Sequence, residues 1–464
     1  MAQVLFIVLV AVAATFFIWR VKADPLAVAF GASVIYFMPG FFGVAQFSYG
    51  YGLESYSELI APGAYGAMAL VIVALAIAAV VADRIPVGPR IRLGFEAKIP
   101  VVLLAFAIVS GLISISNVGV YYLCLDKSII LSKIDVWYYY ASFSVPFCVA
   151  AAYCLRQWPL VAVGVLCLLG ELYAEFRLAT AITFLACAML TEDWLRQGWR
   201  KVVAFMAVMI VGGAALFVAK HLIGPTKYAT ASYCDAQIAL DAKSGANQVE
   251  RRGETKTAAN REATRPLSMG ENLSATAGAL SHSDFYVAAF VSQSEAFVVQ
   301  STLNEVVRRG FHTDARYLIG QILTGLPLGA SVFGIDSSKV ISFNAMVQPV
   351  LFPRVPFGMA NNPWAQAYAA GGEWMVAVFA LGYASILGML NLFFYKTSGA
   401  LKAAFAVISV WIGFYFHRND LFIEVVIIKH VVYICGASIL VAWVWDWMMP
   451  AKRSGAEQSN GLVR

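Results

Sequence analysis

Long apolar segments recur along almost the whole chain, separated by mostly short polar connections. A helix that crosses a membrane needs about 20 apolar residues, because the hydrocarbon core is about 30 Å thick and a helix rises about 1.5 Å per residue. We therefore predict an all-α polytopic membrane protein with about 11 transmembrane helices. The candidate spans are residues 3–19, 25–45, 61–82, 99–117, 137–155, 158–172, 178–192, 202–219, 372–395, 401–416 and 421–447.

The composition agrees with a membrane protein and argues against a soluble one. Hydrophobic residues make up 60% of the 464 residues, and charged residues only 13%. Soluble domains have roughly 25% charged residues. The 7 cysteines are scattered without the spacing of metal ligands, and most lie in apolar runs, where a thiol behaves as a small hydrophobic group. We expect no metal site and no cofactor.

The lysines and arginines of the short loops predict the orientation, because cytoplasmic loops carry an excess of these residues. Alternate loops differ strongly, and one set holds only Lys127, Lys133, Arg177 and Arg418. We expect this poorer set and the N-terminus on the outer side of the membrane, and the C-terminus on the cytoplasmic side. The richer, cytoplasmic set carries Arg20, Lys22, Arg84, Arg90, Arg92, Lys98, Arg156, Arg196, Arg200, Lys201, Lys396, Lys402, Lys452, Arg453 and Arg464.

One long segment, residues 220–364, interrupts the alternation of spans and short loops. It contains no confident span, and the order of the loops places it outside. We divide the chain into an N-terminal bundle of about eight spans (1–219), this external loop with a surface helix, and a C-terminal bundle of about three spans (365–464).

Within the external loop, residues 281–309 have the features of one amphipathic helix. Ser281 opens a capping-box pattern, and Gly310 follows two arginines as a stop signal. Apolar and polar residues recur between them with helical periodicity. We expect this helix to lie along the outer face, with its apolar side on the bundle or the lipid interface and Gln300 and Asn304 on another side.

Arg177 stands between two apolar stretches, 158–172 and 178–190, which leave almost no room for a loop. Its guanidinium must therefore lie at or just inside a membrane face. A cation held in such a place tends to bind an anion. A structural pairing with Glu171 or Glu175 is the alternative.

Several external features follow one another in a distinctive order. They are Arg177 between short spans, the helix ending at Arg308-Arg309-Gly310, Arg316-Tyr317, the strip Phe352-Pro353-Arg354, the span entry Asn362…Ala370-Gly371-Gly372-Glu373, and the turn His417-Arg418-Asn419-Asp420. This order resembles the Wzy-type O-antigen (oligosaccharide repeat-unit) polymerase family. The resemblance covers most of the chain in topology and, in residues, mainly 165–190 and 300–385.

The resemblance implies a GT-C-like fold and polymerisation of undecaprenyl-diphosphate-linked repeat units at the periplasmic face of the bacterial inner membrane. The growing glycan would move to the non-reducing end of a new lipid-linked unit. The implied partners are that lipid-linked oligosaccharide, membrane lipids and a chain-length regulator protein, with no nucleic acid. Two alternatives stay open: a ligase that transfers the glycan to lipid A core, and a lipid-linked sugar transporter or flippase, although no inverted repeat favours the latter.

Such a donor needs cations, because negative charge develops on the departing phosphate. Arginine suits this role through planar, bidentate pairing with phosphate oxygens. For Arg308 and Arg309, at a helix end, compensation of the helix dipole is the competing interpretation. We predict that the substrate diphosphate is bound in one shared pocket by Arg177, Arg316, Arg354 and Arg418.

The acceptor hydroxyl needs a base or an orienting acceptor. The candidates near the arginines are Glu175, His312, Asp314, Glu373, His417 and Asp420. Each has a structural alternative: Glu373 can complement a helix dipole, and Asp420 can cap the last span. The candidate catalytic residues are His312, Asp314, Glu373 and Asp420.

Overall fold

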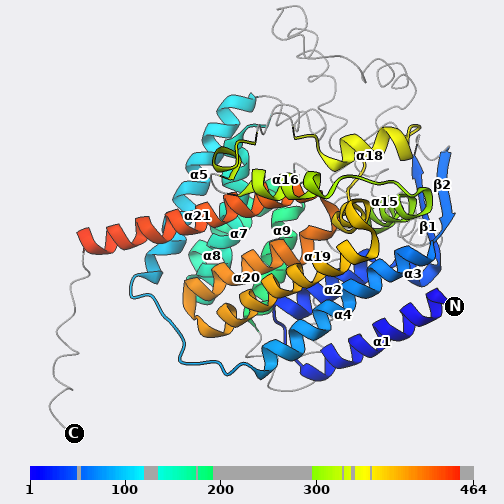
Figure 1. Ribbon diagram of the computed structural model, residues 1–464. Coiled ribbons are helices and arrows are strands. Elements are labelled where there is room, and N and C mark those ends of the chain that lie inside the picture. The colour runs from blue at the N-terminus through cyan, green and yellow to red at the C-terminus, as the bar shows by residue number, and fades with distance from the viewer. Residues whose placement is uncertain are drawn as a thin grey trace, which may run out of the picture.

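Helices make up most of the chain, as the apolar segments predict (Figure 1). The computed structural model describes residues 1–49, 54–119, 134–173, 176–191, 295–326, 329–335, 340–355 and 358–449. In this part of the chain, 6 helices are long and apolar enough to cross a membrane. They are α1 (Ala2–Arg20), α4 (Pro62–Arg84), α5 (Ile99–Val118, preceded by the 3-10 turn Glu96–Lys98), α19 (Pro363–Lys396), α20 (Gly399–Phe414, continued by the 3-10 turn η6, Tyr415–Arg418) and α21 (Leu421–Met448).

Shorter or less apolar helices match further predicted spans. They are α7 (Val136–Cys154), α8 (Trp158–Tyr173) and α9 (Leu178–Leu190). Helices α8 and α9 have only 16 and 13 residues, fewer than the roughly 20 needed for a full crossing. The predicted span 202–219 lies outside the described residues, so the number of about 11 spans stays a prediction.

The predicted span 25–45 is wrong as a single helix. Helix α2 covers only Pro25–Tyr36, and the four-residue helix α3 begins at Pro39 and ends at Phe42. Phe37 leaves the helical conformation, with φ −91° and ψ 7°, and Pro39 has no N–H to donate back to the carbonyl of Ile35. The apolar run therefore breaks near Pro39, and the chain turns into a strand.

That strand, β1 (Val44–Tyr49), pairs with β2 (Glu54–Leu59) in an antiparallel hairpin in which Phe47 lies opposite Tyr56. Ala45 and Phe47 are buried, because side chains two positions apart in a strand point to the same face. The hairpin therefore packs one face onto the protein. In Figure 1 it lies beside α15 and α18 at the right of the molecule.

The amphipathic helix predicted over residues 281–309 appears as α15 (Glu295–Arg309), and residues 281–294 lie outside the described part. Its end agrees with the stop signal, since Gly310 adopts a φ of 60°. Its expected position on the surface is wrong, because Gln300 and Asn304 are both 0% exposed. The hairpin covers this side, and Asn304 donates to the carbonyl of Leu59 and accepts from the N–H of Ala61.

The basic connections come together at one end of the bundle. Arg20 pairs with Asp83 at 2.7 Å, which joins the ends of α1 and α4. Lys98 pairs with Asp446 at 2.9 Å, at the start of α5 and the end of α21. Because α1, α4 and α21 begin at the other end, the hairpin and α15 lie opposite the basic connections.

The two largest apolar clusters of the described residues each contain helices from both parts of the chain. The first joins α1, α2 and α4 with α15, α19 and two short helices, α16 (Ala315–Gly325) and α18 (Phe343–Leu351). The second joins α5, α7 and α9 with α20 and α21. Helices before residue 219 and after residue 365 thus pack directly on each other. Helices α15, α16 and α18 pack in the first of these clusters, so their positions are set by helices from both parts of the chain.

Candidate functional site

A pocket of about 310 Å³ opens at the end of the bundle that carries the hairpin. Two arginines from different segments face it, Arg309 at the end of α15 and Arg354 after α18. The remaining lining is mostly apolar and aromatic: Tyr56, Leu351, Phe352, Pro353 and Val355. A concave, largely apolar site with a few convergent charged groups is the usual form of a small-molecule site.

Arg354 projects from a tight turn. Helix α18 extends to Leu351, and the N–H of Val355 then donates to the carbonyl of Phe352 at 3.1 Å. The strip Phe352-Pro353-Arg354 therefore forms a turn directly after α18, because Val350 and Leu351 still belong to that helix. Leu351, Phe352 and Val355 are buried and anchor the turn, so Arg354 is exposed at its corner. Within the described chain its guanidinium makes no ion pair or hydrogen bond.

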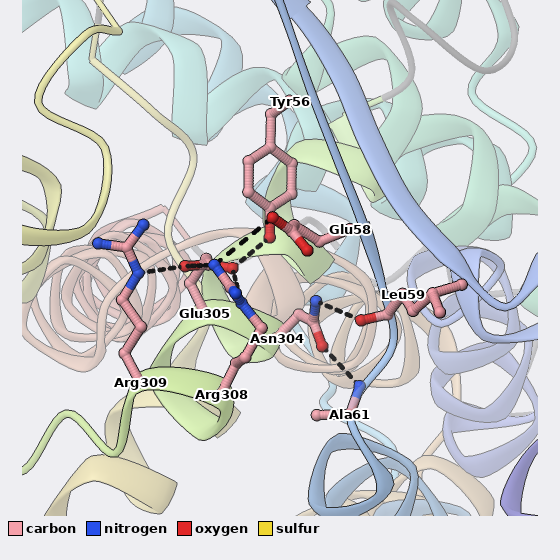
Figure 2. A network of polar contacts seen from close by, with 8 residues as sticks. All are labelled: Tyr56, Glu58, Leu59, Ala61, Asn304, Glu305, Arg308 and Arg309. Carbon is pink, nitrogen blue, oxygen red and sulfur yellow. Dashed lines mark hydrogen bonds and ion pairs between the residues drawn. The ribbon is translucent and has the colours of Figure 1, made fainter.

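The side chain of Arg309 is held by Glu305, which is the centre of the polar network in Figure 2. The carboxylate of Glu305 is 0% exposed and accepts from the Nε of Arg309 at 2.6 Å. It also accepts from Nε of Arg308 at 2.7 Å and from the hydroxyl of Tyr56 at 2.6 Å. Burial acts to raise the pKa of Glu305, but the hydrogen bonds from Arg308 and Tyr56 and the charges of both arginines outweigh it and hold that pKa below its ordinary value.

The two neighbouring arginines bind Glu305 in different ways. Arg308 donates from both Nε and Nη2, at 2.7 and 3.0 Å, and its Nη2 also lies 3.6 Å from Glu58. Arg309 donates from Nε alone. Figure 2 shows the terminal nitrogens of Arg309 pointing away from Glu305. Of the two, only Arg309 lines the pocket and keeps its terminal fork unpaired among the described residues.

The four arginines predicted to share a diphosphate site lie on separate elements, and only Arg354 lines this pocket. Arg177 is exposed at the N-cap of α9, and Arg316 is exposed in the first turn of α16. Arg418 pairs with Glu295 at 2.7 Å, and its guanidinium carbon lies 4.9 Å from the centre of the Tyr415 ring. That pairing gives Arg418 a structural role between α15 and η6.

Two of the predicted acids act as helix caps. Asp314 accepts from the N–H of Arg316 at 2.9 Å at the start of α16. Asp420 is fully buried and accepts from the N–H of Ile423 at 2.9 Å at the start of α21. Its other oxygen accepts from the N–H of Phe343 at 3.2 Å, which ties α18 to α21. These bonds account for the carboxylate of Asp420 without a catalytic role.

We therefore expect Asp420→Ala to act through stability. Loss of an N-cap costs about 1 kcal/mol, and a buried N–H left without an acceptor costs about 1–3 kcal/mol. The purified variant should unfold several degrees below the wild type in a detergent thermal melt, and Asp420→Asn, which keeps a capping oxygen, should regain part of the loss. An unchanged melt combined with lost activity would instead assign Asp420 to catalysis.

Glu373 follows a break in α19, where Gly371 and Gly372 leave the helical conformation and Gly372 has a φ of 66°. Its carboxylate lies against α4, at a place where a Cβ on Gly66 would come within 2.8 Å of Oε1. A Cβ on neighbouring Gly63 would meet both Glu373 and Val307. The exposed Glu373 is thus close to the last turn of α15, which carries the two arginines.

The two histidines near the arginines differ. His312 is exposed just beyond α15. His417 is fully buried, accepts from Nε1 of Trp364 at its Nδ1 (2.9 Å), and lies with Nε2 3.1 Å from the hydroxyl of Ser33. Both ring nitrogens of His417 thus join helices inside the core. Glu175 lies outside the described residues. In the described chain, no group of three or more His, Cys, Asp or Glu residues comes together as metal ligands would.

The described helices define the class of this chain as a helical, membrane-embedded protein. Comparisons with protein-family models, with curated proteins and with solved structures give no match.

Proposed function

We propose that the protein is a membrane glycosyltransferase that polymerises undecaprenyl-diphosphate-linked oligosaccharide repeat units. The observation that carries this proposal is the pocket in which Arg309 and Arg354 meet from segments far apart in the sequence. Each presents guanidinium nitrogens that no described protein group occupies. A diphosphate supplies the paired anionic oxygens that two such forks bind best.

The lining of the pocket supports the same kind of ligand. Phe352 and Tyr56 place aromatic rings 5.5 Å apart at its wall, and Leu351 and Val355 add apolar surface. Aromatic faces suit the apolar side of a sugar ring, and apolar surface suits the first carbons of a polyprenyl chain. Both groups adjoin the diphosphate in a lipid-linked oligosaccharide.

In the proposed reaction, a hydroxyl oxygen of the incoming unit attacks the anomeric carbon of the growing glycan. A new C–O bond forms, the C–O bond to the diphosphate breaks, and the lipid diphosphate leaves. Arg309 and Arg354 stabilise the negative charge that gathers on the departing oxygen. The proton of the hydroxyl passes to a nearby base, for which Glu373 and His312 are the candidates beside α15.

The location of the pocket supports a transferase over a transporter. A transporter binds its cargo near the middle of the membrane, between broken helices of two repeats. This pocket lies at the end of the bundle opposite the basic connections, which we propose is the periplasmic face of the bacterial inner membrane. A lipid-linked diphosphate lies at such an interface.

Deletion of the gene from its bacterium tests the proposal. We expect the high-molecular-weight glycan ladder to disappear and single repeat units to remain on the lipid A core, with the ladder restored by the wild-type gene. An intact ladder would overturn the proposal. Long glycans stranded on the lipid carrier would assign a ligase, and single units kept from the periplasmic face would assign a transporter.

A further inference from the structure

We propose that Glu305 is a positioning residue for the anion pocket: it orients the guanidinium of Arg309 toward the ligand and withdraws Arg308 from it. The inference rests on the proposed function for its natural ligand, a lipid-linked diphosphate. It rests for its geometry on the network in Figure 2.

The first step is the saturation of the carboxylate. Oε1 of Glu305 accepts from Tyr56 and from Nε of Arg308, and Oε2 accepts from Nη2 of Arg308 and Nε of Arg309. These four donors lie at 2.6, 2.7, 3.0 and 2.6 Å. A fully buried carboxylate is costly unless cations and donors surround it, so this arrangement is strongly preferred over one in which any donor swings away.

The second step compares which guanidinium nitrogens of the two arginines are left over after they bind Glu305. Arg308 spends its Nε–Nη2 edge on both oxygens of Glu305. Arg309 spends only Nε, so its Nη1–Nη2 edge is free for a ligand. An arginine fixed at Nε has already lost most of its rotamer freedom, so less entropy is lost when it binds a phosphate. Glu305 thus selects which of two adjacent arginines serves the pocket.

The third step is the hairpin. The Tyr56 hydroxyl binds Glu305, while its ring lies 5.3 Å from Phe47 and 5.5 Å from Phe352. Phe352 is the first residue of the turn that presents Arg354. Strand β2 therefore connects the carboxylate behind Arg309 with the wall beside Arg354, and both sides of the pocket depend on one tyrosine.

The test measures binding of inorganic pyrophosphate to the purified full-length protein by calorimetry at constant ionic strength. We expect Glu305→Gln to weaken binding about tenfold, within the range of coupling between residues in direct contact. The amide of glutamine offers one accepting oxygen in place of two, so Arg309 loses its anchor. Glu58→Gln is the matched control, because Glu58 approaches Arg308 at the exposed rim and not Arg309, and we expect binding to stay unchanged.

A double-mutant cycle separates positioning from general loss of structure. In an Arg309→Ala background, Glu305→Gln should weaken binding no further, whereas in an Arg308→Ala background it should keep its tenfold effect. If Glu305→Gln does not fold, Tyr56→Phe replaces it, because it keeps the ring and removes one donor to Glu305. It should weaken pyrophosphate binding less, and again only where Arg309 is present. Equal losses in both backgrounds, or no loss at all, would overturn the inference. Because pyrophosphate binding requires no glycan transfer, an unaltered ladder after gene deletion would refute the polymerase proposal and leave this result standing.

Discussion

Replacement of Arg354 by lysine is expected to abolish most polymer formation in a protein that still folds and inserts. Arg354 is exposed at the corner of its turn and has no partner among the described residues, so lysine removes no internal contact. An ammonium is a single, strongly hydrated charge and cannot grip two phosphate oxygens as a planar fork does. Loss of one such donor commonly lowers the rate by about 10²–10³.

The glycan ladder of the deletion strain carrying Arg354→Lys measures this effect, at membrane levels matched to the wild type by immunoblot. Arg84→Lys, exposed at the opposite end of the bundle, controls for loss of a surface arginine. A full ladder from Arg354→Lys would show that fork geometry is not needed at this position. Arg177→Lys, tested in parallel, shows whether Arg177, which does not line this pocket, is also needed for polymer formation.

Much of the fold follows from local sequence, because a span is a property of about 20 consecutive residues. The helix ends are equally local. Asp420 accepts from a backbone N–H at the start of α21, as its predicted capping role requires, and Gly310 ends α15 with a positive φ. Helix α19 instead begins at Pro363, before the predicted start at residue 372, although Asn362 caps it. Such signals depend on residues within one turn, so a single sequence is enough to find them.

The hairpin was beyond the sequence pattern. Its first strand directly follows an apolar run that suits a span, and a six-residue alternation is a weak signal beside it. The burial of the polar side of α15 depends on the same hairpin. Asn304 binds backbone groups of Leu59 and Ala61, more than 240 positions away, and a helical pattern says nothing about what covers its polar face.

The candidate site was half predictable for the same reason. Arg354 was predicted as the one arginine of the strip Phe352-Pro353-Arg354, and the structure places it at a pocket. For Arg309, compensation of the helix dipole competed with anion binding in the sequence. The pairing with Glu305 could have been predicted, because Glu305 stands four residues before Arg309 and this spacing brings side chains together on one helix face. What no local pattern contains is the meeting of Arg309 with Arg354, or the pairing of Arg418 with Glu295, which are products of tertiary packing.

Alanine at Arg309 should lower the rate of polymer formation by about 10²–10³, whereas alanine at Arg308 should have a much smaller effect. The two residues are adjacent, equal in charge and similarly exposed, at 47% and 40% of their side chains. They differ in what their guanidinium groups bind. The guanidinium of Arg308 pairs with Glu305 and Glu58, while the terminal nitrogens of Arg309 face the pocket.

The comparison uses initial rates of chain extension by the purified variants, with lipid-linked single units extracted from the deletion strain as substrate. Both variants lose one positive charge, so a purely electrostatic role predicts equal losses and an equal dependence on salt. If the free guanidinium edge of Arg309 binds the ligand, Arg309→Ala should lose more rate than Arg308→Ala. High salt should not lower the rate of Arg308→Ala to that of Arg309→Ala. Equal rates for the two variants would mean that the helix end acts only through its charge, and the diphosphate would then have to be bound by other arginines.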